Sequence, residues 1–371
     1  MQPMQGIRVL EFGDGVAVAM TGLILAEAGA EVIKVESPRS GAAARAGEPR
    51  LGAVALDFAL LNAGKKSVAV DLEADGAAAR LRPLLASADV LIDGLRPGTM
   101  GERGLDYDAV AAVNDRLLYC SLSGWGQDGP LAREAGRDLN YLGATGLLRL
   151  GADETGAPVL PPAEIADIAA GAYPAVINIL LALMARAQSG KGSRLDLAIC
   201  DGLFALAYWA IGRAELTGRW PVPGGETLTG GSPRYQLYAT ADGRFVAVAA
   251  LEPDHWDNLC ERLELDEELR DDQRDPEATR QALAAIIAAR TARYWHDKFE
   301  NRDLCCSVVE TLEQALANPQ FRDRGLFERK LRAGGQAITA VVVPVAASTR
   351  ESDRVRAAPA LGADNALLDQ A

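Results

Sequence analysis

The chain has 371 residues, in which 38 Lys and Arg face 51 Asp and Glu, so its formal net charge is −13. An apolar content of 49% and a charged content of 24% are those of an ordinary globular protein, which excludes intrinsic disorder and a disulfide scaffold. The acidic balance argues against nucleic acid or an anionic membrane as the main partner, because both require basic surfaces. Any bound anion must therefore be held by a local cluster of Arg and Lys.

Targeting segments and metal sites are not indicated by the sequence. The N-terminal residues lack the basic and apolar regions of a signal peptide, so we expect a cytoplasmic protein. The most apolar stretch, from Pro174 to Arg186, has 13 residues and is too short to cross a bilayer. The five cysteines lack metal-ligand spacing and there are only two histidines, His255 and His296, so we expect reduced thiols and no metal site.

Strands alternate with helices in the first 200 residues. Short apolar runs predict strands at 7–12, 31–35, 67–72, 89–95 and 116–124. Helical segments are expected up to Ala28, at 76–87 and at 107–113. A long helix at 168–188, a strand at 193–199 and a helix after Cys200 continue the pattern. This alternation predicts an α/β fold with a parallel sheet covered on both faces.

The composition changes after about Leu216. Proline and glycine are concentrated at 218–233, which predicts a linker or mobile loop. Two apolar runs then flank Asp242 and Gly243, and these residues predict a hairpin because Asp-Gly supplies the positive φ angles of a tight turn. Helices are expected to about residue 330, and a strand at 337–346. We therefore expect a large domain at 1–200 completed by 331–371, a linker at 201–228 and a small domain at 229–330.

The first turn imitates a dinucleotide-binding fingerprint. Gly13 and Gly15 follow the first strand, and Glu36 ends the second. The third glycine position holds Val18, and without that glycine the helix is not expected to sit close to the strand in the usual way. A tight turn of an ordinary α/β fold is therefore favoured over a nicotinamide site.

Six basic residues lie at or just after the expected carboxyl ends of strands. They are Arg39, Arg45, Lys65, Lys66, Arg96 and Arg103. Open α/β sheets bind ligands at this edge, and clustered Arg and Lys suit phosphates. Each of these residues, taken singly, is as readily explained as a solvated charge on the surface. Taken together in an acidic protein, they indicate an anion-binding site.

Asp167 stands at the start of an otherwise apolar helix. Such an aspartate is typical of an N-cap or a first turn, where the helix dipole stabilises its charge. Its neighbours Ala169, Ala170, Gly171 and Ala172 are all small, which leaves space for a bulky substrate to reach the carboxylate.

Longer strings resemble the family III CoA transferases, the CaiB/BaiF family. They are IRVLEFGDG, LAEAGAEVIKVE, LNAGKKSVAVDL, DVLIDGLRPGTMGERGLDYD, LLYCSLSGWGQDGPL, GRDLNYLGATG and LYATADGRFVAVAALEP. The resemblance covers essentially the whole chain, and it is closest to the α-methylacyl-CoA racemase branch. It implies a Rossmann-like large domain with a small α+β domain, and an interlocked homodimer in which each ring-like chain threads the other.

The resemblance also implies site residues. It makes Arg39, Lys65, Arg96 and Arg103 the ligands of the nucleotide and pyrophosphate of coenzyme A, and Asp167 the catalytic carboxylate. In the transferases this aspartate attacks an acyl-CoA thioester to give a mixed anhydride; CoA thiolate then forms an enzyme thioester, and an incoming carboxylic acid takes over the CoA. An acyl-CoA and a carboxylic acid are thus the implied substrates, without a tightly bound cofactor.

One position departs from the racemase branch. There the aspartate is one of two proton-transfer groups, and the other is a histidine that begins an HDLNY-like string and is assisted by a glutamate. The glutamate is present as Glu252, but the histidine position holds Arg137. Arginine, with a pKa above about 12, cannot exchange protons near neutral pH.

We therefore expect a CoA transferase in which Arg137 clamps a substrate carboxylate or pairs with Glu252. A racemase or epimerase with altered chemistry and an acyl-CoA-binding protein without catalysis remain the alternatives. His255, three residues after Glu252, is expected at the surface or as a helix cap.

Overall fold

The structure is a computed structural model that describes residues 2–39, 41–153, 155–300, 302–350 and 355–369. The chain divides into two compact units. The large unit comprises Met1–Thr145, Pro161–Leu206 and Gln320–Ala371, and the small unit comprises Gly146–Leu160 and Ala207–Pro319. Each unit is described separately below.

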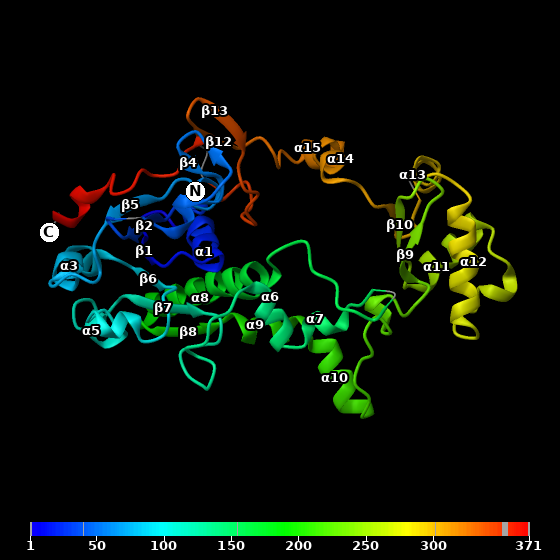
Figure 1. Ribbon diagram of the computed structural model, residues 1–371, viewed down its shortest axis with the longest axis horizontal. Coiled ribbons are helices and arrows are strands. Elements are labelled where there is room, and N and C mark those ends of the chain that lie inside the picture. Colours follow the sequence, from blue (N-terminus) through cyan, green and yellow to red (C-terminus); the bar gives the residue numbers. More distant parts are fainter. Residues whose placement is uncertain (1, 40, 154, 301, 351–354, 370–371) are drawn as a thin grey trace. The chain divides into compact units, whose positions relative to one another are not determined.

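The large unit contains most of the strands (Figure 1). Its elements are β1 (Arg8–Phe12), α1 (Val16–Glu27), β2 (Glu31–Glu36), η1 (Ala43–Ala46), β3 (Arg50–Leu51), β4 (Val54–Ala55), α2 (Leu56–Leu61), β5 (Lys66–Ala69), α3 (Ala77–Ser87), β6 (Val90–Asp93), α4 (Thr99–Glu102), α5 (Tyr107–Ala111), β7 (Leu118–Ser123), α6 (Asp138–Ala144), η2 (Ala166–Ala172), α8 (Tyr173–Ser189), β8 (Arg194–Ala198), α9 (Ile199–Leu206), α15 (Pro319–Asp323, which begins at the boundary), β12 (Lys330–Ala333), β13 (Gln336–Thr339), β14 (Val355–Arg356) and η5 (Asn365–Asp369).

A six-stranded parallel sheet organises this unit, in the order β5-β2-β1-β6-β7-β8. Parallel strands with helices on both faces are buried on both sides, which explains the unbroken apolar runs of β1 and β6. The chain proceeds from β1 outward through β2 and β5, and then returns to build β6, β7 and β8 on the other side. The order therefore reverses between β1 and β6, and open α/β sheets bind their ligands beyond the carboxyl ends of the strands at such a point. The predicted α/β class and parallel sheet are confirmed.

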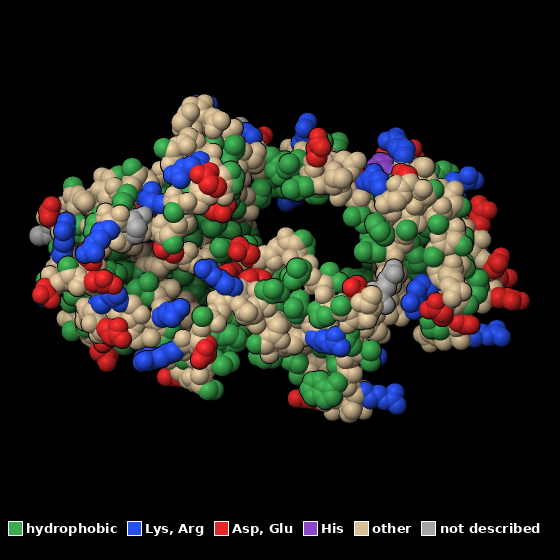
Figure 2. Space-filling model, in the orientation of Figure 1, with side chains coloured by type: hydrophobic (Ala, Val, Ile, Leu, Met, Phe, Trp, Pro, Cys, Tyr) green, Lys and Arg blue, Asp and Glu red, His purple; other side chains and the backbone are tan. Residues whose placement is uncertain are grey.

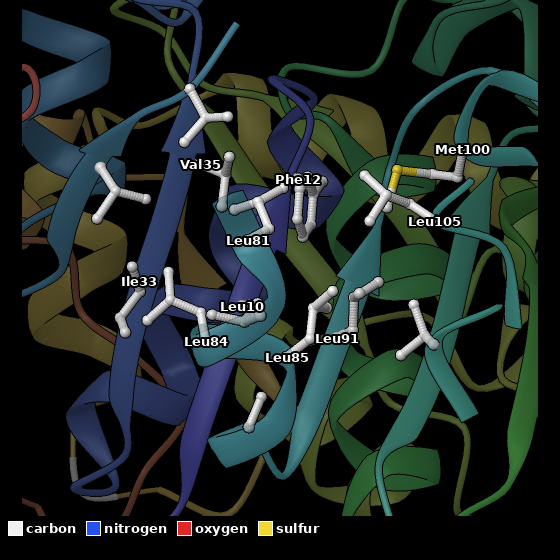
Figure 3. Close-up of a cluster of buried hydrophobic side chains, with 14 of the residues drawn as sticks. Leu10, Phe12, Ile33, Val35, Leu81, Leu84, Leu85, Leu91, Met100 and Leu105 are labelled. Carbon is white, nitrogen blue, oxygen red and sulfur yellow. The ribbon is translucent and has the colours of Figure 1, made fainter. Parts of the chain in front are cut away.

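The main core lies between the sheet and α3 (Figure 3). Leu81, Leu84 and Leu85 of α3 pack on side chains of the sheet such as Leu10 and Phe12, and all five are 3% exposed or less. Full burial of one such side chain stabilises the fold by about 1.5–3 kcal/mol. Another core cluster of this unit joins α1 to the helix that carries Asp167, and it includes Leu23 of α1 and Ala172 of η2.

The helix that carries Asp167 is longer than its apolar stretch suggested. The π-helix η2 continues directly into α8, and together they span the 24 residues Ala166–Ser189, within which an 18-residue window has a mean hydropathy of 1.9. By length and composition alone this helix could cross a membrane, but the core helices of soluble proteins pass the same test. Its Ala175, Ile179 and Ala182 are buried, whereas Leu181 and Met184 on another face are exposed. The expectation that this region is too short to span a bilayer was wrong on length, because the helix extends beyond the 13-residue run at both ends.

The small unit is built around a three-stranded antiparallel sheet, in the order β11-β10-β9. Its elements are α7 (Leu147–Leu150), α10 (Tyr208–Thr217), η3 (Thr227–Thr229), β9 (Tyr235–Ala239), β10 (Phe245–Ala249), α11 (Pro253–Leu263), η4 (Glu267–Leu269), α12 (Pro276–Ala288), α13 (Ala292–Phe299), β11 (Cys306–Val308) and α14 (Leu312–Ala317). Trp256 and Trp295 are both 2% exposed in its core.

Three local expectations differ from the structure. The segment expected as a linker at 201–228 contains α10, because Ala210 and Ala214 are buried along one face of that helix. The hairpin forms, but among its turn residues only Gly243 has a positive φ, of 73°. The expected strand at 337–346 stops at Thr339; Pro344 has no backbone N–H to donate, and Val343 packs with α1 instead.

Candidate active site

A cavity of about 730 Å³ lies at the carboxyl ends of β1, β6 and β7, where the strand order reverses. All of its lining residues belong to the large unit. They are Asp14, Gly15, Ala17, Val18, Ala43, Ala44, Gly94, Leu95, Arg96, Pro97, Leu122, Ser123, Gly124, Trp125, Ala132, Glu134, Ala135, Gly136, Arg137, Asn140, Tyr141, Asp167 and Ile199. Figure 2 shows Lys and Arg side chains interspersed with Asp and Glu over the visible face of this unit.

Two glycines bring the loops after β1 and β6 together. A Cβ added at Gly13, whose φ is +107°, would lie 2.9 Å from the backbone carbon of Gly94. A Cβ at Gly94 would lie 2.2 Å from Cγ2 of Val18. In a dinucleotide fingerprint, a third glycine on the helix provides the space for close packing. Here Gly94, which directly follows the neighbouring strand β6, provides that space. This explains why Val18 is compatible with close packing between the first helix and the sheet.

A buried ion cluster fixes the turn after β1. The Lys34 ammonium donates hydrogen bonds to the Gly13 carbonyl at 2.6 Å and to Glu11 Oε1 at 3.1 Å. The Lys65 ammonium donates to Glu11 Oε2 at 2.7 Å, to the Ala19 carbonyl and to Asn62. Burial lowers the pKa of Lys65 to about 8, against the opposing effect of Glu11. Because the Lys65 side chain is 0% exposed and makes these three bonds, it supports the site from within and does not reach a phosphate, contrary to the expectation from the resemblance.

The Asp167 carboxylate is placed by an unusual piece of helix. Residues 166–172 form a π-helix, and such turns are frequent at functional sites. Pro174 has no N–H, so the Ala170 carbonyl lacks the donor that an α-helix would supply. On α9, a Cβ added at Gly202 would lie 2.3 Å from that carbonyl oxygen. The proline and the glycine together allow η2 to pack against α9, with Asp167 on its first turn at the cavity.

The surroundings of Asp167 oppose the ionisation of its carboxyl group. Its backbone N–H donates to Asp138 Oδ1 at 2.9 Å. Burial, followed by the nearby charges of Asp138 and Glu164, raises the pKa of Asp167 to about 6, and Arg137 opposes this. Above that pH the group is a poorly solvated carboxylate, which is more basic and more nucleophilic than one in water.

Arg137 and two aromatic rings complete the wall. Arg137 is the N-cap residue of α6, and its backbone N–H donates to Asn140 Oδ1 at 3.0 Å. Tyr141 meets Trp125 edge-on, with ring centroids 5.1 Å apart. The indole Nε1 of Trp125 is buried and has no hydrogen-bond partner among the described residues. A buried donor without a partner costs about 1–3 kcal/mol, and a ligand in the cavity would relieve that cost.

The basic residues at the strand ends have different surroundings. Arg96 lines the cavity, is exposed, and forms no ion pair within the described part of the chain. Arg39 is exposed and donates to Asp71 at 3.1 Å, while Arg103 donates to the Thr99 carbonyl at 3.0 Å. Neither of these two lines the cavity. The remaining two are paired with carboxylates: Arg45 with Glu36, and Lys66 with Glu31.

The structure thus brings Asp167, Arg137 and Arg96 to one cavity. Glu252 belongs to the small unit, where it is the N-cap residue of α11. Its Oε2 lies 3.1 Å from Nδ1 of His255, and this hydrogen bond lowers the pKa of Glu252. Sequence reasoning missed Gly94 and Trp125 as wall residues; the GWG string directly after β7 is the signal that marks Trp125.

Comparisons with known proteins agree with this architecture. A family model described as CoA-transferase family III matches residues 4–365. The chain is 33% identical to α-methylacyl-CoA racemase of Mus musculus, covering 87% of this chain and 82% of the relative. It is 31% identical to succinate–glutarate CoA-transferase of Agrobacterium fabrum, covering 99% and 94%. The crystal structure of a CaiB/BaiF family protein from Brucella suis superposes with a TM-score of 0.83 at 27% identity, covering 99% and 98%. The chain therefore belongs to CoA-transferase family III.

Proposed function

We propose that this protein is a CoA transferase that moves CoA between an acyl-CoA thioester and a carboxylic acid. One observation carries the proposal: Asp167, a carboxylate of raised pKa, lines the same cavity as the Arg137 guanidinium. The first group suits nucleophilic attack on a thioester, and the second suits a two-pronged grip on a carboxylate. The transferase relative from Agrobacterium, which matches nearly the whole chain, supports this choice.

The proposed reaction passes through four exchanges at Asp167. Its carboxylate attacks the thioester carbonyl, which releases CoA thiolate and leaves a mixed anhydride. The thiolate attacks the aspartyl carbonyl of that anhydride and expels the first acid as a carboxylate, leaving CoA on Asp167 as a thioester. The incoming carboxylate attacks this thioester, forming a second anhydride and releasing CoA thiolate again. The thiolate then attacks the new acyl carbonyl, which gives the new acyl-CoA and free Asp167.

The cavity walls suggest distinct roles for the other residues. Arg137 holds the acid carboxylate next to Asp167, and the unpartnered Trp125 N–H is a donor for a substrate oxygen. Arg96, without an ion pair among the described residues, binds a phosphate of CoA. Arg39 and Arg103 are proposed as further contacts to the nucleotide, for which Arg39 would exchange Asp71 for a phosphate.

A racemase is the second candidate, because the mouse racemase is among the relatives at 33% identity. Racemisation requires proton transfer on both faces of the α-carbon. The two histidines of the sequence, His255 and His296, are both in the small unit, and the position that holds histidine in the racemase branch is Arg137. Since arginine does not exchange protons near neutral pH, the transferase is favoured.

We also propose that the protein forms a homodimer, as the family resemblance implies. The exposed apolar residues on α8, including Ile177, Leu181 and Met184, suit an interface between copies.

The experiment compares transfer with proton exchange. The protein is incubated in deuterated water with an acyl-CoA and a panel of mono- and dicarboxylic acids, and mass spectrometry follows new CoA thioesters and deuterium at the α-carbon. We expect new thioesters without α-exchange, and borohydride added during turnover should reduce a thioester at Asp167 to an alcohol. Glu164→Gln, an exposed carboxylate one turn before Asp167, is the matched control and should retain transfer, whereas Asp167→Asn should lose it. Deuterium uptake without new thioesters would favour the racemase and overturn the proposal.

A further inference from the structure

Three potential metal ligands converge in the small unit, outside the cavity described above. Glu252 and His255 lie at the start of α11, and Cys305 directly precedes β11. His255 Nδ1 lies 3.1 Å from Glu252 Oε2 and 3.3 Å from Cys305 Sγ. All three donor atoms lie within 4.8 Å of one another. Two elements separated by some 50 residues of chain thus bring three different donor types to one point.

These distances suit a tetrahedral metal ion. Zinc binds histidine nitrogen at about 2.0–2.1 Å, thiolate at about 2.3 Å and carboxylate oxygen at about 2.0–2.2 Å. Two ligands at a tetrahedral angle are then about 3.6 Å apart for nitrogen and sulfur, and about 3.4 Å apart for nitrogen and oxygen. The observed separations of 3.3 and 3.1 Å are each about 0.3 Å shorter. A small outward movement of exposed side chains is enough to admit the ion.

The other nitrogen of the same imidazole has the partner that a metal-binding histidine needs. His255 Nε2 lies 3.2 Å from Asp303 Oδ1. In the metal-free structure Nδ1–H donates to Glu252 Oε2; a metal ion takes the place of that proton, and the Asp303 carboxylate then holds the remaining proton on Nε2. Metal-binding histidines almost always donate their second N–H in this way. Asp303 is therefore a second observation that points to a ligand, independent of the three donor atoms.

The backbone separates the two adjacent thiols. Cys305 has a left-handed backbone with a φ of 47°, which is uncommon for a residue other than glycine and is costly unless its surroundings maintain it. Cys306 Sγ contacts the Leu304 carbonyl at 3.2 Å, and Cys306 pairs with Val248 in the sheet. Only the Cys305 thiol therefore reaches the imidazole, and it is exposed to solvent.

We propose that Glu252, His255 Nδ1 and Cys305 Sγ form a binding site for a divalent transition metal ion, with Zn²⁺ as the best match. One thiolate, one imidazole and one carboxylate are borderline-soft ligands that favour zinc over magnesium or calcium. The fourth position is open to water, because Cys305 and Glu252 are exposed. The proposal does not depend on the transferase reaction, and metal binding occupies the carboxylate of Glu252.

Metal binding is measured directly on full-length, tag-free, reduced protein. Zn²⁺ is titrated in competition with a chromophoric chelator, and Co²⁺ is used as a spectroscopic probe. We expect one Zn²⁺ per chain, and a cobalt adduct with a thiolate-to-cobalt charge-transfer band and the visible absorption of a tetrahedral ion. Asp303→Asn should weaken Zn²⁺ binding about 10- to 100-fold, the effect of losing a partner of a ligating histidine, and Cys305→Ser and His255→Asn should weaken it at least as much.

Matched controls are present in the chain. Cys306→Ser removes the neighbouring thiol and His296→Asn removes the other histidine, and both variants should bind Zn²⁺ as the parent protein does. Wild-type protein without a cobalt–thiolate band would overturn the proposal even if a variant failed to fold. Stoichiometric Zn²⁺ binding that is unchanged in folded Cys305→Ser would also overturn it.

Discussion

Asp167 combines an ionisable group with surroundings that oppose its ionisation. Burial and the charges of Asp138 and Glu164 raise its pKa to about 6, and Arg137 compensates only in part. These surroundings therefore cost folding stability whenever the carboxyl is ionised. Active sites commonly show this trade-off between function and stability.

Asp167→Asn is expected to stabilise the protein at neutral pH. The carboxyl has a higher pKa in the folded chain than its ordinary value of 3.8, so the folded state holds the proton more tightly. The wild-type penalty is absent below about pH 4, grows as the pH rises, and is complete above about pH 6. At pH 7 the free energy of unfolding in urea should be about 1–2 kcal/mol higher for the variant, a value that allows for the partial exposure of the carboxylate. Near pH 4 the two proteins should be equally stable. A variant less stable than wild type at pH 7 would contradict this account.

The pH profile of transfer should follow the ionisation of Asp167. As the nucleophile must be charged, kcat/KM is expected to fall as the pH drops through about 6. Asp138→Asn retains an oxygen that accepts the Asp167 N–H but removes a negative charge that raises the pKa of Asp167, so the fall should move to lower pH. Glu164→Gln should move it in the same direction. A profile that neither variant changes would assign the ionisation to another group.

Arg96 is the residue of the basic set that lines the cavity and forms no ion pair with the described residues, and both features suit a phosphate. Arg96→Ala should weaken CoA binding by about 1.5–3 kcal/mol, the contribution of a hydrogen bond to a charged group. Calorimetry at several salt concentrations measures the effect. Arg80→Ala, an exposed arginine on α3 outside the cavity, is the control and should leave the affinity unchanged. Equal affinity of Arg96→Ala and wild type at every salt concentration would remove Arg96 from the site.

At the scale of elements, the site depends on close contacts between backbones. Gly94 allows Val18 to pack at the β1–β6 crossing, and Gly202 allows α9 to approach η2. Glycines at such positions act through the absence of a side chain, with no need for a positive φ. Neither Gly94 nor Gly202 has one.

Gly202→Ala is therefore expected to destabilise the large unit and to reduce transfer. The added methyl group would lie 2.3 Å from the Ala170 carbonyl oxygen, so α9 or the π-helix must move. Overpacking of this kind costs about 1–3 kcal/mol, which exceeds the gain of up to about 1 kcal/mol from better helix propensity. Gly143→Ala on α6 has open space around it and should be neutral or stabilising in the same urea measurement. Full stability of Gly202→Ala would show that the two helices separate without cost.

At the scale of the whole molecule, the sequence was sufficient for the features that local pattern determines. The βαβ alternation predicted the parallel sheet, and the position of Asp167 before small residues marked a carboxylate that lines the cavity. Lys65 was assigned to the ligand because its position at a strand end does not reveal that Glu11, far away in sequence, binds its ammonium. The cluster of Glu252, His255 and Cys305 was not foreseen for the same reason, since its ligands have no motif spacing and meet only in the folded small unit. Long-range pairings of single charges are invisible to periodicity.

The apolar face of α8 leads to a prediction about assembly. Ile177, Leu181 and Met184 repeat at spacings of three and four residues and are 55%, 58% and 67% exposed, which is the pattern of a helix that packs against a partner. A second copy of the chain is the proposed partner. Leu181→Lys would place a charge in the centre of this face and should shift the protein toward a monomer at low concentration, as measured by light scattering. Ser189→Lys, exposed at the end of the same helix but turned away from this stripe, adds the same charge and should not change the molar mass. A wild-type protein that is monomeric at all concentrations would exclude the dimer. If the protein instead sedimented with lipid vesicles, the stripe would be assigned to a bilayer, because the helix is long enough to span one.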